Sequence, residues 1–177
     1  MPQLQGTRLA FIDVESTGLD ATDELVELAI ISEDERILFD SLVRPAGSHA
    51  SHAEHIHGIT ASQLASAPPF PEVEAEISTL LDGAVPVAHN VDYDLELILR
   101  AYTLHSAETA PAPAGLECTM GMAMAAAGSS RRLRLHEALE RFGIQKPSTG
   151  SFHRAAYDAE CARRLWLALS LRDPAKD

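Results

Sequence analysis

Four carboxylates and one histidine stand in three short motifs: Asp13 with Glu15, then Asp94, then His153 with Asp158. Carboxylates that converge in space repel one another unless cations lie between them. Mg²⁺ and similar hard cations prefer carboxylate oxygens as ligands, and histidine adds a base that titrates near neutral pH. If the fold brings these motifs together, the set fits metal-assisted hydrolysis of a phosphodiester.

Each of these residues also has a plainer interpretation when it is taken alone. Asp13 and Glu15 leave the same face at the end of an expected strand, where solvated acids are common. Asp94 begins an expected helix, where an acid stabilises the helix dipole. His153 could be a solvated loop residue, whereas Asp158 lies among apolar helix residues, where a lone buried carboxylate is costly. These plainer interpretations become less favoured only if the fold brings the three motifs together in space.

The ligand chemistry favours Mg²⁺ or Mn²⁺ over structural zinc, because the set is rich in carboxylates and contains no cysteine. The corresponding scheme uses two ions about 3.5–4 Å apart on the scissile phosphate. In that scheme His153 takes the proton from the attacking water, and the second ion stabilises the leaving 3′ oxygen.

Length and composition indicate one α/β domain over residues 1–177, with a core at about 7–171. The chain is 46% hydrophobic and 23% charged, which is ordinary for a globular protein. No apolar run is long enough to cross a bilayer, and the N-terminus has no signal pattern. Cys118 and Cys161 lie in no metal or redox spacing, so we expect a reduced cytoplasmic protein without membrane contacts.

The net charge of -12 argues mildly against a broad nucleic-acid surface, although a metal site would offset several acids locally. Two basic clusters, Arg131, Arg132 and Arg134, and Arg163 with Arg164, could contact phosphate. An ordinary solvated helix face explains each cluster as well.

The order of the elements predicts a mixed sheet covered by helices. Branched apolar runs predict strands, and residues 107–115, rich in alanine and proline, predict a surface loop. A capping box at Thr60 predicts the start of a small helix. The expected strands are 8–14, 25–32, 37–43, 85–88 and 116–119, and the other expected helices are 71–81, 92–104, 120–127, 133–142 and 155–171. Strands come first and then alternate with helices, which indicates the α/β class.

Together the motifs resemble the three exonuclease motifs of the DEDDh 3′–5′ exonucleases, a family that includes the polymerase proofreading epsilon subunit, RNase T and oligoribonuclease. Residues 11–19 resemble the first motif, 87–97 the second, and 153–158 have the histidine and aspartate spacing of the third. Residues 57–60 match a further short segment of these enzymes. The resemblance covers about residues 7–170. The departures are small: Ser16 and Tyr93 replace a frequent Thr and Phe, and Cys118 replaces a frequent Asp.

The resemblance implies a ribonuclease H-like fold, with a five-stranded mixed sheet flanked by helices, and release of 5′-mononucleotides from single-stranded 3′ ends. It implies that Asp13, Glu15, Asp94 and Asp158 hold two metal ions and that His153 is the general base. It also implies a set of substrate-binding residues. Ser16, Thr17, Gly18 and Leu19 would line the pocket of the 3′-terminal nucleotide, with His57 and Asn90 near the substrate.

Several alternatives stay open at this point. The substrate is DNA, slightly favoured, or RNA, as for an exoribonuclease. A second class is a non-catalytic nucleic-acid-binding or scaffold module, although such domains typically lose a metal carboxylate. A third is a zinc protein built on four clustered histidines, His49, His52, His55 and His57. A DNA polymerase and a second copy of the chain are candidate partners. Because the sequence ends six residues after Leu171, we expect a freestanding or weakly associated nuclease.

Overall fold

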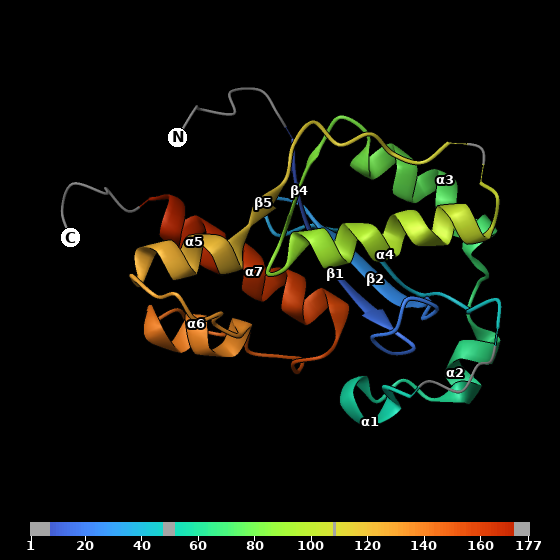
Figure 1. Cartoon of the computed structure of the whole chain (residues 1–177), viewed down its shortest axis with the longest axis horizontal. Coiled ribbons are helices and arrows are strands. Elements are labelled where there is room, and N and C mark those ends of the chain that lie inside the picture. Colours follow the sequence, from blue (N-terminus) through green and yellow to red (C-terminus); the bar gives the residue numbers. More distant parts are fainter. Residues whose placement is uncertain (1–7, 48–51, 108, 172–177) are drawn as a thin grey trace.

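The computed structural model describes residues 8–47, 52–107 and 109–171. Over this part of the chain a five-stranded sheet has the strand order β3-β2-β1-β4-β5 (Figure 1). The strands are β1 (Leu9–Ser16), β2 (Leu25–Ile31), β3 (Ile37–Leu42), β4 (Val85–Ala88) and β5 (Glu117–Cys118). The predicted α/β class with a five-stranded mixed sheet is therefore confirmed.

The sheet changes from antiparallel to parallel pairing at its central strand, β1. It pairs antiparallel with β2 and parallel with β4, and β4 pairs parallel with β5. The carboxyl ends of β1, β4 and β5 therefore lie at the same edge of the sheet, where α/β proteins place their ligands. The register between β1 and β2 shifts between Glu15 and Ser16. Such irregularities often lie beside functional sites because they redirect side chains.

Seven helices are described: α1 (Glu54–His57), α2 (Ala61–Ser66), α3 (Phe70–Leu81), α4 (Val91–Leu104), α5 (Thr119–Ala126), α6 (Leu135–Arg141) and α7 (Ala155–Ser170). α5 and α6 gather beside α7, and α3 lies beside α4 (Figure 1). None of these helices is long and apolar enough to cross a bilayer.

Two apolar layers cover opposite faces of the sheet because successive strand residues point to opposite sides. Ile12 and Val14 of β1 pack with residues of α3 and α4. Leu9 and Phe11 pack with the small residues at the start of α7. The central strand is therefore fixed on both faces, and the acids that follow Phe11 on its side of β1 continue toward α7.

The element bounds follow the sequence prediction closely, with two informative differences. β1 continues to Ser16, so Glu15 lies within the strand and not after it. The sixth helix begins at Leu135 and not at Leu133. The capping box at Thr60 is present, with Gln63 as its partner, and no helix or strand occurs in the described part of 107–115.

The interpretation of Arg163 was wrong in both of its forms. Its side chain is only 4% exposed, and the guanidinium forms ion pairs with Glu160 and Glu35. It therefore neither lies on a solvated helix face nor is accessible to phosphate. Arg131, by contrast, is 68% exposed and pairs with Glu137.

Candidate active site

The first two acids project from β1 toward the start of α7. Asp13 and Glu15 alternate with buried residues, and each retains partial access to solvent at the end of an otherwise buried strand. Since Phe11 faces α7, the period-two geometry of the strand places Asp13 and Glu15 on that same side. Alternation along one strand thus provides two of the four carboxylates.

The other two acids lie in the first turns of two helices that begin near this edge of the sheet. Asp94 lies in the first turn of α4, which starts three residues after β4 ends, and it is 5% exposed. Asp158 lies in the first turn of α7 and is 7% exposed. The positive end of each helix dipole stabilises a carboxylate at this position. Favourable helix ends and burial therefore act together on these two residues.

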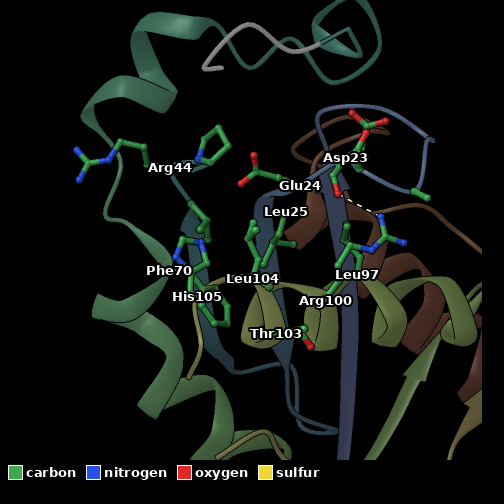
Figure 2. A pocket seen from close by; sticks show the side chains of 15 residues that line it. Asp23, Glu24, Leu25, Arg44, Phe70, Leu97, Arg100, Thr103, Leu104 and His105 are labelled. Atoms are coloured by element: carbon green, nitrogen blue, oxygen red, sulfur yellow. Dashed lines mark hydrogen bonds between the residues drawn. The ribbon is translucent and has the colours of Figure 1, made fainter. Parts of the chain in front are cut away.

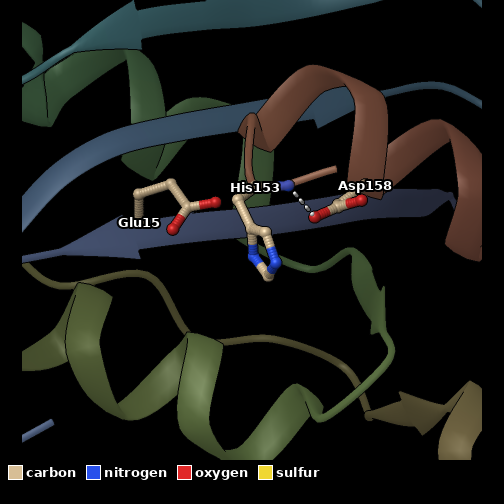
Figure 3. Close-up of side chains that lie close together, drawn as sticks. All are labelled: Glu15, His153 and Asp158. Carbon is tan, nitrogen blue, oxygen red and sulfur yellow. Dashed lines mark hydrogen bonds between the residues drawn. The ribbon is translucent and has the colours of Figure 1, made fainter. Parts of the chain in front are cut away.

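A compact group joins β1 to α7 (Figure 3). Potential ligand atoms of Glu15, His153 and Asp158 all lie within 4.8 Å of one another. The backbone N–H of His153 donates a hydrogen bond of 2.9 Å to Oδ2 of Asp158. The other oxygen, Oδ1, is buried and has no hydrogen-bond partner, and it is the one side-chain atom in this condition among the described residues. A buried carboxylate oxygen without a donor has the chemistry expected of a cation ligand.

The backbone of His153 is in an unusual conformation. Its φ is 64°, in the left-handed region, which costs a residue with a side chain about 1–2 kcal/mol. The hydrogen bond to Asp158 helps to hold this conformation. The imidazole is exposed to solvent beside the carboxylates, so it can exchange a proton with water.

Mutual repulsion marks the carboxylates as one electrostatic group. Burial, followed by Asp94, Asp158 and Glu15, raises the pKa of Asp13 well above its usual value. Burial is also the largest cause for the others, raising the pKa of Glu15 to about 8, of Asp94 to about 7 and of Asp158 to about 6. Nearby carboxylates add to the increase in each case. A divalent cation would relieve this repulsion, so the donor set and the partnerless Asp158 oxygen fit a hard metal ion.

The expected nucleotide-binding residues do not share one environment. Ser16 and Thr17 are buried, whereas Leu19 is 85% exposed. Thr17 Oγ1 donates a 2.6 Å hydrogen bond to Asp23, and a Cβ on Gly18 would lie 2.5 Å from an Asp23 oxygen. Glycine permits this close approach, whereas a side chain at this position would have to displace the Asp23 carboxylate. The segment forms a turn, closed by a hydrogen bond from the N–H of Thr17 to the carbonyl of Glu24, that leaves Leu19 exposed to solvent.

Two further expected substrate neighbours, Asn90 and His57, differ in accessibility. Asn90 is exposed at the N-cap of α4, without a side-chain cap hydrogen bond. His57 is 5% exposed, and its Nδ1 accepts a 2.9 Å hydrogen bond from the N–H of Ile59. Burial lowers the pKa of His57, and a hydrogen bond with the Ser16 backbone opposes that shift. His57 therefore contacts the first motif from inside the protein.

The histidine-rich segment does not form a described zinc cluster. Over residues 8–47, 52–107 and 109–171, the one group of potential ligands is Glu15, His153 and Asp158. His57 already uses Nδ1 in the hydrogen bond to Ile59, and His49 lies outside the described residues. These contacts favour a structural role for His57.

Two residues beside the group were missed by the sequence analysis. Glu27 of β2 lies opposite Glu15 in the strand register and is 2% exposed. Its carboxylate accepts hydrogen bonds from the side chain of Arg154, with the shortest at 2.6 Å, and from the N–H of Ala155. The available signal was a single charge inside the apolar run 25–31. Arg154, its partner 127 residues further along the chain, has no local sequence feature that points to this pair.

A separate cavity of about 320 Å³ lies between the 21–25 segment, the end of α4 and Phe70 (Figure 2). None of the four acids or His153 lines it. Arg100 lies at its wall and donates hydrogen bonds to the carbonyls of Asp20 and Asp23. Arg100 thus supports the turn that follows Gly18.

Comparison with known proteins agrees with this arrangement. Residues 10–165 match the family model of RNase T, described as an exonuclease. The chain belongs to this exonuclease family. An uncharacterized exonuclease, CP81 of Escherichia phage 186, is 34% identical over 98 residues, which are 55% of this chain and 50% of that protein. The DNA polymerase III subunit epsilon of Treponema pallidum is 28% identical over 89% of this chain and 74% of its own length.

Solved structures of DEDDh exonucleases share the fold. Exonuclease X in complex with 5′-overhanging duplex DNA has a TM-score of 0.64 at 23% identity, over 91% of this chain and 90% of that one. The nuclease domain of 3′hExo, a DEDDh family member bound to rAMP, has a TM-score of 0.61 at 16% identity. The match covers 93% of this chain and 90% of that one. The ribonuclease H-like fold is thus confirmed. The chain spans half or less of the length of the first curated relatives that it matches.

Proposed function

We propose that this protein is a metal-dependent 3′–5′ exonuclease that hydrolyses phosphodiester bonds at the 3′ end of single-stranded nucleic acid and releases 5′-mononucleotides. The observation that carries the proposal is the group of Glu15, His153 and Asp158, whose potential ligand atoms lie within 4.8 Å of one another and which includes a buried Asp158 oxygen without a donor. Family membership supports the reaction class. We propose that residues 1–177 form the single domain that performs it, with a core at about 7–171.

Asp13, Glu15, Asp94 and Asp158 would hold the metal, as two Mg²⁺ or Mn²⁺ ions. Such ions, when bound, supply a more acidic water and neutralise charge on the phosphate and the leaving oxygen. The all-carboxylate donor set favours these hard ions. Helix N-termini hold Asp94 and Asp158, and β1 fixes the spacing of the other two acids.

His153 is suited to act as the general base. Its ring reaches to within 4.8 Å of ligand atoms of Glu15 and Asp158, so a proton removed near those carboxylates has a short path to it. Because His153 is exposed, bulk water can then take the proton. The turn at 16–19 would contact the terminal nucleotide, with Leu19 as its exposed apolar residue.

The substrate proposal is DNA in preference to RNA. Relatives named as DNA polymerase III epsilon subunits support DNA and make a polymerase a candidate partner. The fold neighbours include a structure with duplex DNA, one with rAMP and several with RNA, so the fold alone is compatible with both. The 2′-hydroxyl is the chemical group on which the choice depends.

A direct test compares 5′-labelled single-stranded DNA and RNA of the same sequence, with Mn²⁺ or Mg²⁺ and with EDTA. We expect a ladder shortened from the 3′ end, 5′-mononucleotide products, no reaction in EDTA and faster cleavage of DNA. Asp158→Ala should abolish turnover, and Glu76→Ala, on the exposed side of α3, serves as the control. Internal cleavage, activity in EDTA or an active Asp158→Ala variant would contradict the proposal, and binding without cleavage by the native protein would favour a non-catalytic module.

A further inference from the structure

Glu27 is a charged residue in the interior of the sheet. Its side chain is only 3% exposed, and a buried carboxylate is costly unless charged or polar groups compensate it. Nε of Arg154 lies 3.1 and 3.2 Å from the two oxygens, and Nη2 lies 2.6 Å from one of them. The N–H of Ala155 adds a hydrogen bond of 3.0 Å. Glu27 therefore binds the start of α7 through both a side chain and the backbone.

Three consecutive residues at this point are held by two carboxylates. The N–H of His153 donates to Asp158, whereas Arg154 and Ala155 donate to Glu27. His153 has its left-handed backbone conformation between these two attachments. Its Cα is consequently fixed from both sides, and the direction in which its ring leaves the chain is fixed with it.

We propose that Glu27 and Arg154 are positioning residues that hold His153 toward Glu15 and Asp158. This inference rests on the proposed exonuclease function, in which His153 is the base. Arg154 is 45% exposed, so a rival role is direct contact with a phosphate of the substrate. The bidentate geometry with Glu27 favours the positioning role, because a planar guanidinium that is paired in this way is held in one orientation.

The first measurement is independent of activity. Hydrogen exchange of the His153 amide reports on its bond to Asp158, since local opening controls the exchange rate. Arg154→Gln should increase this rate by about tenfold or more. Arg163→Gln is the matched control, because it removes another arginine–glutamate pair of α7 at a distance from the site. It should reduce overall stability and leave the ratio of His153 exchange to global exchange unchanged.

The second measurement asks whether Arg154 acts through His153. Arg154→Gln should lower kcat by about 10- to 100-fold, with KM changed by less than about threefold, as expected for a displaced catalytic group. When His153 is already replaced by alanine, Arg154→Gln should lower kcat by less than about twofold, because the effects of residues that act as a unit are not additive. Arg154→Lys keeps the positive charge but cannot form the bidentate pair with Glu27. It should therefore retain more of the native kcat than Arg154→Gln. Glu27→Gln should match Arg154→Gln if it folds.

The results separate this inference from the proposed function. A native protein without nuclease activity would refute the exonuclease proposal, whatever the amide exchange shows. An active native protein in which Arg154→Gln costs the same factor with and without His153 would overturn only the positioning role. A rise in KM at constant kcat would assign Arg154 to substrate contact, and unchanged exchange of the His153 amide would equally overturn the inference.

Discussion

Glu15→Gln should stabilise the metal-free protein, although it removes one of the proposed metal ligands. In the native fold, burial raises the pKa of Glu15 from 4.5 to about 8, with further increases from Asp158, Glu27 and Asp94. Arg154 opposes these effects without cancelling them. The ionised carboxylate is therefore unfavourable in the folded state, and a neutral amide of similar shape removes that cost.

The size of the effect follows from the pKa difference. Each pH unit between the folded and unfolded pKa corresponds to about 1.36 kcal/mol, so 4.5 and about 8 give an upper limit of about 5 kcal/mol. The neighbouring carboxylates take up protons together with Glu15, and the site relaxes, both of which reduce the gain. We expect the free energy of unfolding to rise by about 1–3 kcal/mol at pH 8 in EDTA.

The sign can be checked through the pH dependence. Because the folded pKa is higher than the unfolded one, the contribution of Glu15 to stability is full below about 4.5 and is lost as pH rises through about 8. The advantage of Glu15→Gln should thus be small near pH 5 and largest above pH 8. Saturating Mg²⁺ or Mn²⁺ should make the native protein more stable than Glu15→Gln. An ion that binds only the folded native protein raises its free energy of unfolding by about 2.7 kcal/mol at 100 times the Kd.

Urea unfolding followed by circular dichroism, from about pH 5 to 9 with EDTA or Mn²⁺, measures these differences. Glu76→Gln on the exposed side of α3 is the matched control and should change stability by less than about 0.5 kcal/mol at every pH. If Glu15→Gln destabilises the protein in EDTA, or follows the control across this pH range, then Glu15 does not belong to a repelling carboxylate group and the argument for a metal site fails.

Two other predictions concern the histidine and the turn beside it. His153→Ala should lower kcat by about 10²–10⁴ at neutral pH, as expected for a lost general base, and a loss below about tenfold in single-turnover assays would remove it from that role. Gly18→Ala should lower the free energy of unfolding by about 1–3 kcal/mol, because its Cβ would lie 2.5 Å from Oδ2 of Asp23, which already accepts a hydrogen bond from the N–H of Asp20. In the same urea experiment Gly121→Ala, whose Cβ would have its nearest neighbour at 4.0 Å, should be neutral or stabilising, and an equal loss in both variants would contradict the steric argument.

Local patterns were sufficient for most of the fold. Alternation, apolar runs and the capping box at Thr60 predicted the elements because these signals lie within a few residues of one another. The order of the elements predicted the mixed sheet, and the exonuclease resemblance added the ribonuclease H-like fold with five strands. The burial of Asp158 was also predictable, because its helix neighbours are apolar.

Contacts between distant segments were beyond sequence reasoning. Arg163 was expected on a solvated face or at a phosphate, yet its buried guanidinium pairs with Glu35 of the β2–β3 turn, 128 residues away. The place of His57 near the substrate stays a prediction, but its burial against the backbone of Ser16 was not foreseen. In both cases the side chain is polar and its partner is far away in sequence, so no local pattern distinguishes a buried role from an exposed one.

The antiparallel pairing of β1 and β2 connects these observations. It places Glu27 opposite Glu15, so that a carboxylate facing the site and a buried carboxylate are neighbours across two strands. Glu27 increases the repulsion on Glu15 and Asp158, yet it also receives the arginine and the backbone N–H that secure the start of α7. Replacing Glu27 with an apolar residue would relieve the repulsion but would release the segment that carries His153. The same residue thus raises the electrostatic cost of the metal-free site and fixes its geometry, which is the combination expected where a bound cation completes the structure.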